Sequence, residues 1–106
     1  MTIKTTSGAT FQADVLDSSG LLLVLYYING LPGVDAALGV MTLLDETYGD
    51  SVTICKIECS AEEQLMTDNL VNIIPMVAGY KDGVKFNEFR HPARFEVFSR
   101  LVKGDV

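Results

Sequence analysis

An unbroken apolar run from Leu21 to Ile28 is the feature that most restricts how this chain can fold. The run does not alternate between polar and apolar side chains, so a strand formed here must be buried on both faces. The run is also far shorter than the ~20 residues that a membrane-spanning helix requires. We therefore expect a central strand of a sheet that is covered by helices, and no membrane association.

The residues after this run predict a turn and then a helix. The turn is Gly30-Leu31-Pro32-Gly33-Val34, and apolar residues then recur at helical spacing from Ala37 to Tyr48. A strand–turn–helix junction exposes side chains at the positive end of the helix, where an anion is favoured. Here the exposed positions carry Leu31 and Val34, which cannot ionise, attack or ligate. The junction is typical of a reactive site but lacks reactive groups.

The other elements follow from periodicity and from residues typical of caps and turns. We expect a first helix with Phe11, Val15 and Leu16 on one face and Thr10 as its cap, which Ser19-Gly20 could end. A strand is expected over 51–59, followed by a helix from 60 to about 70 that begins with a capping box of Ser60 and Glu63. Strands over 76–80 and 84–89 are expected around a turn at 81–83. The last expected helix has Pro92 in its first turn, and its core-facing residues are Phe95, Phe98, Leu101 and Val102.

This order of elements predicts one α/β domain over residues 1–106. We expect a mixed central sheet of four to five strands with helices on both faces. Lys and Arg total 8 against 14 Asp and Glu, which gives a net charge of −6. A nucleic-acid surface needs a basic stripe that neutralises phosphates, so this balance argues against nucleic acid as a direct partner.

Four segments of the chain resemble the thioredoxin family. They are Thr10-Phe11-Gln12-Ala13-Asp14-Val15-Leu16, Gly20-Leu21-Leu22-Leu23-Val24, Asn72-Ile73-Ile74-Pro75-Met76 and Tyr80-Lys81-Asp82-Gly83. The resemblance extends from Phe11 to Gly83 without gaps and implies a thioredoxin-like fold. It places the family's cis-proline at Pro75 and puts Gly39 where the family has a helix-kinking proline.

The departures from the family pattern concern its redox groups. Where thioredoxins have Trp-Cys-Gly-Pro-Cys, this chain has Gly30-Leu31-Pro32-Gly33-Val34, and Leu25 replaces the family's buried acid. Tyr27 and Gly30 replace the tryptophans that shield the site. Thiol–disulfide exchange needs an attacking thiolate and a resolving partner, and neither is present at the turn. We therefore expect no catalytic residue at the turn, and a redox-inactive chain that is not an enzyme.

The only two cysteines, Cys55 and Cys59, fall on the strand expected over 51–59. Positions i and i+4 of a strand share a face but lie about 13 Å apart, whereas a disulfide needs Cα atoms within about 7 Å. With a single histidine in the chain, a zinc site is not expected either. We expect buried cysteines that act as small apolar side chains, and no metal or cofactor. The alternative is that Cys59, near the strand's end, is exposed and open to modification.

An alternative hypothesis is that the chain is an enzyme, or has a thiol-dependent activity, at a non-standard site. This site would involve Cys59, Lys56 or His91. Lys56 matches the family's lysine beside the buried acid and has lost that partner, so it turns to Glu58 or to solvent. A catalytic lysine with a depressed pKa is the less favoured interpretation. His91 falls near a loop that, by resemblance, borders the family's active surface, and a cap or loop role is favoured over catalysis.

The main functional hypothesis from the sequence is a binding or assembly module. It would hold a protein or peptide partner, or a second copy of the chain, through an apolar surface at the former active site. The expected contact residues are Gly30, Leu31, Pro32, Gly33, Val34, Ile74, Pro75 and Met76. The competing interpretation is that Leu31 and Val34 fold inward and fill the space of the missing disulfide. The first residues lack the apolar core of a signal peptide, so a cytoplasmic location is expected.

Overall fold

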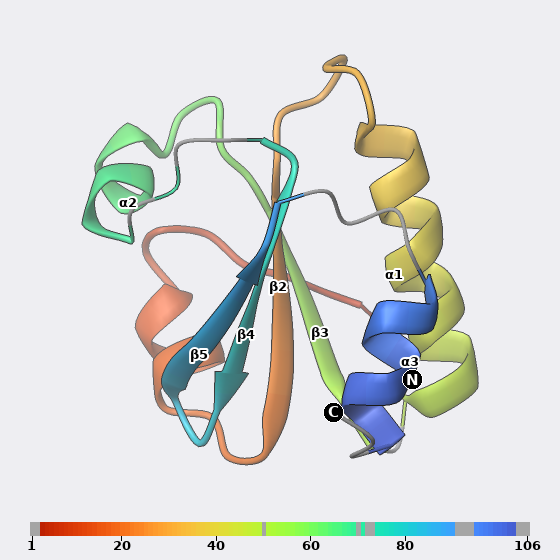
Figure 1. Cartoon of the computed structure of the whole chain (residues 1–106). Helices are drawn as coiled ribbons and strands as arrows, with labels where there is room; N and C mark the ends of the chain where they lie inside the picture. The colour runs from red at the N-terminus through yellow and green to blue at the C-terminus, as the bar shows by residue number, and fades with distance from the viewer. Residues whose placement is uncertain (1–2, 50, 70, 72–73, 91–94, 104–106) are drawn as a thin grey trace.

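The computed structural model describes residues 3–49, 51–69, 71, 74–90 and 95–103 (Figure 1). Nine elements lie within these residues, and most of the expected ones are present. They are β1 (Lys4–Thr5), a π-helical turn η1 (Gln12–Leu16), β2 (Leu21–Tyr27), α1 (Val34–Tyr48), β3 (Thr53–Glu58), α2 (Glu63–Asp68), β4 (Met76–Lys81), β5 (Val84–Phe89) and α3 (Phe95–Lys103). Within these ranges, no helix is long and apolar enough to cross a bilayer.

The strands form one mixed sheet, as the sequence predicted, and their order in it is β1-β3-β2-β4-β5. Both β1 and β2 run parallel to β3, whereas β4 is antiparallel to β2 and to β5. The parallel pair β2 and β3 is joined through α1, the crossover that parallel strands require. The expected double burial of β2 is confirmed, because its residues from Leu22 to Tyr27 are all buried.

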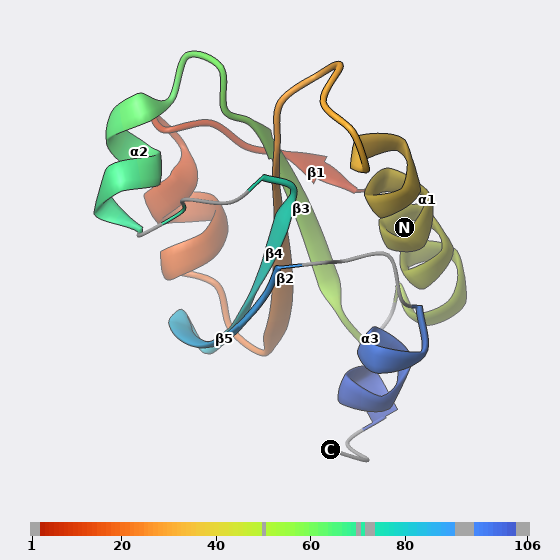
Figure 2. The same ribbon diagram turned by 45° about the horizontal axis from the view of Figure 1, so that its top comes forward.

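Helices cover both faces of the sheet, so the core has two halves (Figures 1 and 2). On one face Leu23 and Leu25 of β2 pack with Met41 of α1 and Phe98 of α3. On the opposite face Tyr26 packs with residues of η1, and Leu65 and Met66 of α2 lie against that cluster. Alternate residues of β2 thus enter opposite halves of the core, which the two-residue period of a strand dictates.

Several local expectations differ from the structure. The capping box is wrong: α2 begins at Glu63 after Glu62, with no side-chain cap. The Ser60 hydroxyl instead donates to the Glu58 carboxylate, a partner supplied by the end of β3. Thr10 likewise makes no cap to the helical turn, because its hydroxyl accepts the Ser7 amide at 3.1 Å.

The first strand also differs from the expectation, whereas the last helix agrees with it. Strand β1 was not predicted, since it has only two residues and no apolar pattern. The last helix packs as expected through Phe98, whose ring meets Phe89 of β5 at a centroid distance of 4.8 Å. The expected role of Pro92 in that helix's first turn lies outside the described residues.

Candidate functional site

The turn between β2 and α1 exposes one large apolar side chain rather than two. Leu31 is 41% exposed, whereas Val34 is only 3% exposed because it opens α1 and packs into the core beneath that helix. Gly30 and Gly33 have φ of +88° and +86°, a backbone conformation that other residues rarely adopt. Gly30, Pro32 and Gly33 are exposed. The inclusion of Val34 in the exposed surface is therefore wrong.

The loop before β4 lies against this turn. The Ile74–Pro75 peptide bond is cis. A Cβ atom at Gly33 would lie 3.7 Å from Cγ of Pro75, so the two loops are in contact range. Ile74 and Pro75 are half-buried, but Met76 is fully buried, because it begins β4 opposite Tyr26 and packs in the same core cluster as that residue. The inclusion of Met76 in the exposed surface is also wrong.

Both cysteines are buried on the same side of the sheet. Cys55 lies in the middle of β3, in register with Lys4 of β1 and Val24 of β2, and its side chain has 0% exposure. Cys59 comes directly after β3 and is 2% exposed. Both are free thiols in the cluster beneath η1 and α2. The expected burial is confirmed, and the alternative of an exposed Cys59 is wrong.

The backbone holds Cys59 at the end of the sheet beside the turn. Its amide donates to the Tyr27 carbonyl at 2.8 Å, which extends the pairing of β2 and β3 by one residue. Its thiol points to the Ile57 carbonyl at 3.5 Å. Because Tyr27 ends β2 and the turn follows it, Cys59 lies near the base of the connection that carries Leu31.

Burial makes both sulfurs weak nucleophiles at neutral pH. Desolvation raises the pKa of the Cys59 thiol to about 11, and the nearby Glu58 and Glu62 carboxylates act in the same direction. The pKa of Cys55 is also raised to about 11, again mainly by burial. The thiolate is the reactive form, so reaction of either sulfur is favoured by alkaline pH.

The other residues of the alternative hypothesis are placed less favourably for chemistry. Lys56 is half-buried opposite Leu25 and makes no ion pair with any described residue. Glu58 does not pair with it, because its carboxylate accepts the amides of Asn29 at 2.9 Å and Ser60 at 2.8 Å. These hydrogen bonds and that from the Ser60 hydroxyl lower the pKa of Glu58. His91 lies outside the described residues.

Sequence reasoning missed a pair of buried tyrosines beside Cys59. The hydroxyls of Tyr26 and Tyr80 lie 3.3 Å apart inside the core, next to the ring of Phe11. Burial raises the pKa of Tyr26, and its neighbours Tyr80 and Cys59 contribute to that shift. The signal in the sequence was Tyr26 within the apolar run from Leu21 to Ile28, because a buried tyrosine hydroxyl needs a hydrogen-bond partner. No group of three or more potential metal-ligating side chains gathers among the described residues.

Comparison with known proteins defines the class of the protein. The fold matches the crystal structure of thioredoxin from Malassezia sympodialis with a TM-score of 0.83, over 97% of this chain and 90% of that one, at 14% identity. The architecture is therefore the thioredoxin-like fold that the resemblance implied. No family model matches the sequence.

Two relatives establish the family. The thioredoxin of Acetoanaerobium sticklandii is 30% identical over 79 residues, which are 74% of this chain and 75% of that protein. Thioredoxin C-2 of Corynebacterium nephridii is 30% identical over 82 residues, 77% of this chain and 76% of that protein. This chain belongs to the thioredoxin family.

These relatives correct two expectations. The sequence predicted a redox-inactive binding module and a chain that is not an enzyme, and both predictions are contradicted because the relatives are named thioredoxins, an oxidoreductase family. The predictions rested on the turn alone, where Leu31 and Val34 stand. They gave too little weight to the two cysteines that the chain keeps in the adjoining strand region.

Proposed function

We propose that this protein is a thiol–disulfide oxidoreductase of the thioredoxin family that reacts through Cys59. The observation that carries the proposal is the position of Cys59, at the end of β3 and one hydrogen bond from the residue that ends β2. Family membership supports the reaction class, and the absence of sulfur from residues 30–34 directs that reaction to another thiol.

Cys59 is favoured over Cys55 because of what surrounds each sulfur. Cys55 is enclosed within β3, which has β1 on one side and β2 on the other. Cys59 lies just beyond the last residue of β3, in a cluster against which Leu65 and Met66 of α2 pack. No residue of α2 is fully buried, and Glu62, which precedes it, is held by its amide to the Cys59 carbonyl at 3.0 Å and by the Gly8 amide to its carboxylate at 2.9 Å. Local opening at α2 would uncover Cys59 without breaking the sheet.

The proposed exchange uses one protein thiol at a time. Cys59 loses its proton, and the thiolate attacks one sulfur of a substrate disulfide; the new S–S bond forms as the old one breaks, and the other substrate sulfur leaves as a thiolate. Cys55 is not suited to resolve this mixed disulfide, because four residues along a strand span about 13 Å. A low-molecular-weight thiol therefore attacks the Cys59 sulfur of this mixed disulfide, and the second substrate sulfur leaves as a thiolate. A second such thiol then attacks the small-molecule sulfur of the new mixed disulfide, which frees Cys59 as a thiolate and forms a low-molecular-weight disulfide. The free thiols of a reducing, cytoplasmic setting would supply this reductant.

The raised pKa predicts a slow reaction at neutral pH. With a pKa of about 11, roughly one Cys59 thiol in ten thousand is ionised at pH 7. A thiolate of high pKa is intrinsically a strong nucleophile, which offsets part of this low fraction. The activity should therefore be weak at pH 7 and should rise steeply towards alkaline pH.

Disulfide reduction with insulin as substrate and dithiothreitol as reductant tests the proposal. We expect the wild-type chain to accelerate reduction above the reductant alone, Cys59→Ala to lose this acceleration, and Cys55→Ala to keep it. The two variants make the same change at two buried thiols, so each controls for the other's effect on folding. Equal rates for the wild type and Cys59→Ala, with both folded by circular dichroism, would contradict the proposal.

A further inference from the structure

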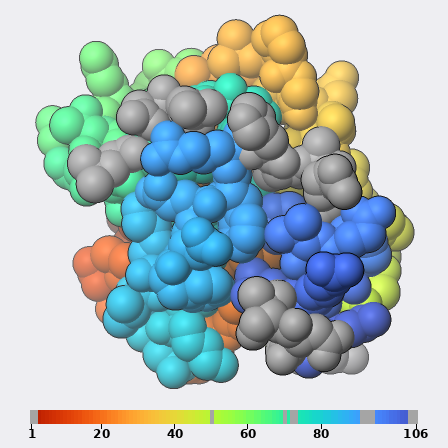
Figure 3. Space-filling model, viewed as in Figure 1, coloured from red at the N-terminus to blue at the C-terminus, as the bar shows by residue number. Residues whose placement is uncertain are grey.

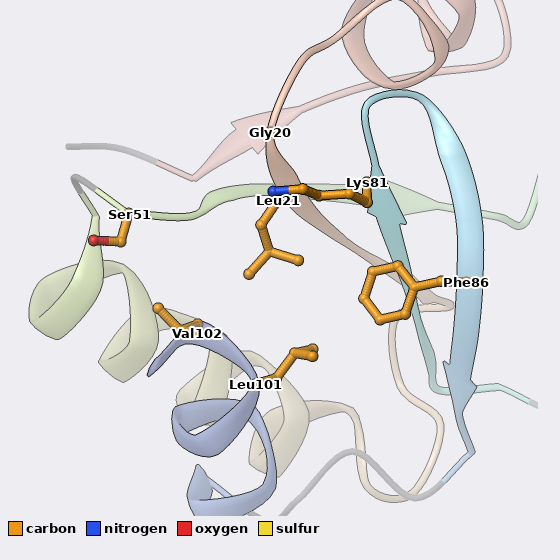
Figure 4. Close-up of a pocket in the computed structure, with 7 residues that line it drawn as sticks. All are labelled: Gly20, Leu21, Ser51, Lys81, Phe86, Leu101 and Val102. Atoms are coloured by element: carbon orange, nitrogen blue, oxygen red, sulfur yellow. The ribbon is translucent and has the colours of Figure 1, made fainter. Parts of the chain in front are cut away.

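A hollow lies at the start of β2, at the opposite end of this strand from Cys59. It has a volume of about 620 Å³ and opens between β5 and α3, which adjoin on one face of the molecule (Figures 3 and 4). This volume falls within the range of small-molecule sites in proteins. The hollow is lined by Gly20, Leu21, Ser51, Lys81, Phe86, Leu101 and Val102.

Its walls are apolar side chains from three separate elements. Leu21 begins β2, Phe86 lies on β5, and Leu101 comes from the last turns of α3; Figure 4 shows all three directed towards a common space. Phe86 remains 45% exposed even though its ring lies over the sheet. A large apolar side chain that stays exposed at the edge of a hollow gains stability when an apolar ligand covers it.

The position of Phe86 is set by a glycine on the neighbouring strand. A Cβ atom at Gly79 would lie 2.7 Å from Cζ of Phe86, so the ring occupies space that any other residue at position 79 would fill. The pairing of β4 and β5 also shifts register between Gly79 and Tyr80. The aromatic wall of the hollow is therefore fixed by backbone features of the sheet.

A single cation lies over this apolar space. Figure 4 shows the Lys81 side chain extended across the rim towards Leu21. The Lys81 ammonium group makes no hydrogen bond or ion pair with any residue that the structure describes. The neighbouring acid, Asp82, does not pair with Lys81, and its carboxylate accepts the amide of Gly20, a residue that lines the hollow, at 2.7 Å. An ammonium group beside apolar walls complements a ligand with one negative charge and an apolar body.

We propose that this hollow binds a small aliphatic carboxylate, such as a free medium-chain fatty acid. Its chain would lie between Phe86, Leu21 and Leu101, and its carboxylate would pair with Lys81. A monovalent head group fits better than a phosphate, since one lysine is the only cation lining the described part of the hollow and the protein carries a net charge of −6. The proposal is independent of Cys59 and of the thiol chemistry.

A nuclear magnetic resonance titration of the full chain with octanoate and with 1-octanol tests this site. We expect both ligands to shift the amide resonances of Leu21, Phe86 and Leu101, and octanoate to bind about fivefold more tightly, the gain of one partly exposed ion pair. Lys81→Met should abolish this preference, so that octanoate binds no more tightly than 1-octanol. Lys4→Met removes the same charge at the far edge of the sheet and should keep the preference.

Phe86→Ala checks the apolar part of the site. Its side chain is partly exposed, so the fold should tolerate the change, and both ligands should bind at least threefold more weakly. Three results would overturn the proposal: shifts centred on other residues, an octanoate preference that survives Lys81→Met, or unchanged affinities in Phe86→Ala. Failure of both small ligands to bind would be a fourth contrary result and would favour a peptide or a second copy of the chain as the occupant.

Discussion

The reactivity of this chain is decided by where two sulfur atoms lie. Leu31 and Val34 hold the turn positions, and the thiols are displaced into the sheet at Cys55 and Cys59. Burial protects both and raises their pKa values to about 11. The reactivity of each thiol is thus limited by its burial from solvent as well as by the chemistry of cysteine.

Alkylation of the native protein should follow the ionisation of Cys59. Because the thiolate is the reacting form and its pKa is raised to about 11, the labelling rate with iodoacetamide should increase about tenfold for each pH unit between pH 7 and 9. Mass spectrometry of the modified peptide measures this rate for Cys59 and Cys55 separately. A rate for Cys59 that does not change with pH would show that access, and not ionisation, limits the reaction.

The buried tyrosine pair predicts a coupling in stability. Tyr26→Phe leaves the Tyr80 hydroxyl without its buried partner and should lower the free energy of unfolding by about 1–2 kcal/mol. The double variant with Tyr80→Phe removes both hydroxyls, so its loss should be smaller than the sum of the two single losses. Urea unfolding of the four proteins measures this coupling, and additive losses would contradict the hydrogen bond.

At the scale of elements, pattern and periodicity predicted most of the fold. The apolar run of β2 and the helical spacing of α1 dictate their burial because each segment is long enough for its period to be unambiguous. The two-residue β1 and the start of α2 were not predictable in the same way. Both depend on partners distant in sequence, such as the pairing of Lys4 with Cys55 and the hydrogen bond from Gly8 to Glu62.

The site was less predictable than the fold for a related reason. Sequence placed Met76 and Val34 beside the turn, but exposure depends on which side of its element each residue faces. Met76 opens β4, and the register of β4 against β2 turns its side chain into the core. Neighbours along the chain could not reveal that register.

Helix α1 carries a glycine that its position does not require. Gly39 lies in the helix interior, and a Cβ atom there would meet no other atom within 4 Å. Gly39→Ala should therefore raise the free energy of unfolding by about 0.5–1 kcal/mol, since alanine loses less backbone entropy in a helix. Thermal unfolding measures the change, and a lower midpoint than the wild type would contradict the helical geometry at this position.

Helix α2 should be the least stable part of the cover over Cys59. It spans six residues, none of them fully buried. Its amide hydrogens should exchange with solvent at least a hundredfold faster than those of β2, where every residue from Leu22 to Tyr27 is buried. Hydrogen exchange followed by nuclear magnetic resonance provides both rates, and equal protection of α2 and β2 would argue against local access to Cys59.

At the scale of the whole molecule, the two ends of the sheet have different surroundings. The cysteine end combines the turn, the loop at Pro75 and the thiol of Cys59. The other end has the hollow between β5 and α3, with its lysine and apolar walls. The thioredoxin-like fold contains both the cysteine end and the hollow, and the proposed redox reaction needs only the cysteine end.

Trapping of the mixed disulfide is the most direct test of that reaction. The native chain is incubated at pH 9 with an excess of oxidised glutathione, quenched with acid and mapped by mass spectrometry. We expect a glutathione adduct on Cys59 that forms well before any on Cys55, and no adduct on Cys59→Ala until unfolding exposes Cys55. Modification of both cysteines only when the protein is unfolded would contradict redox chemistry at Cys59.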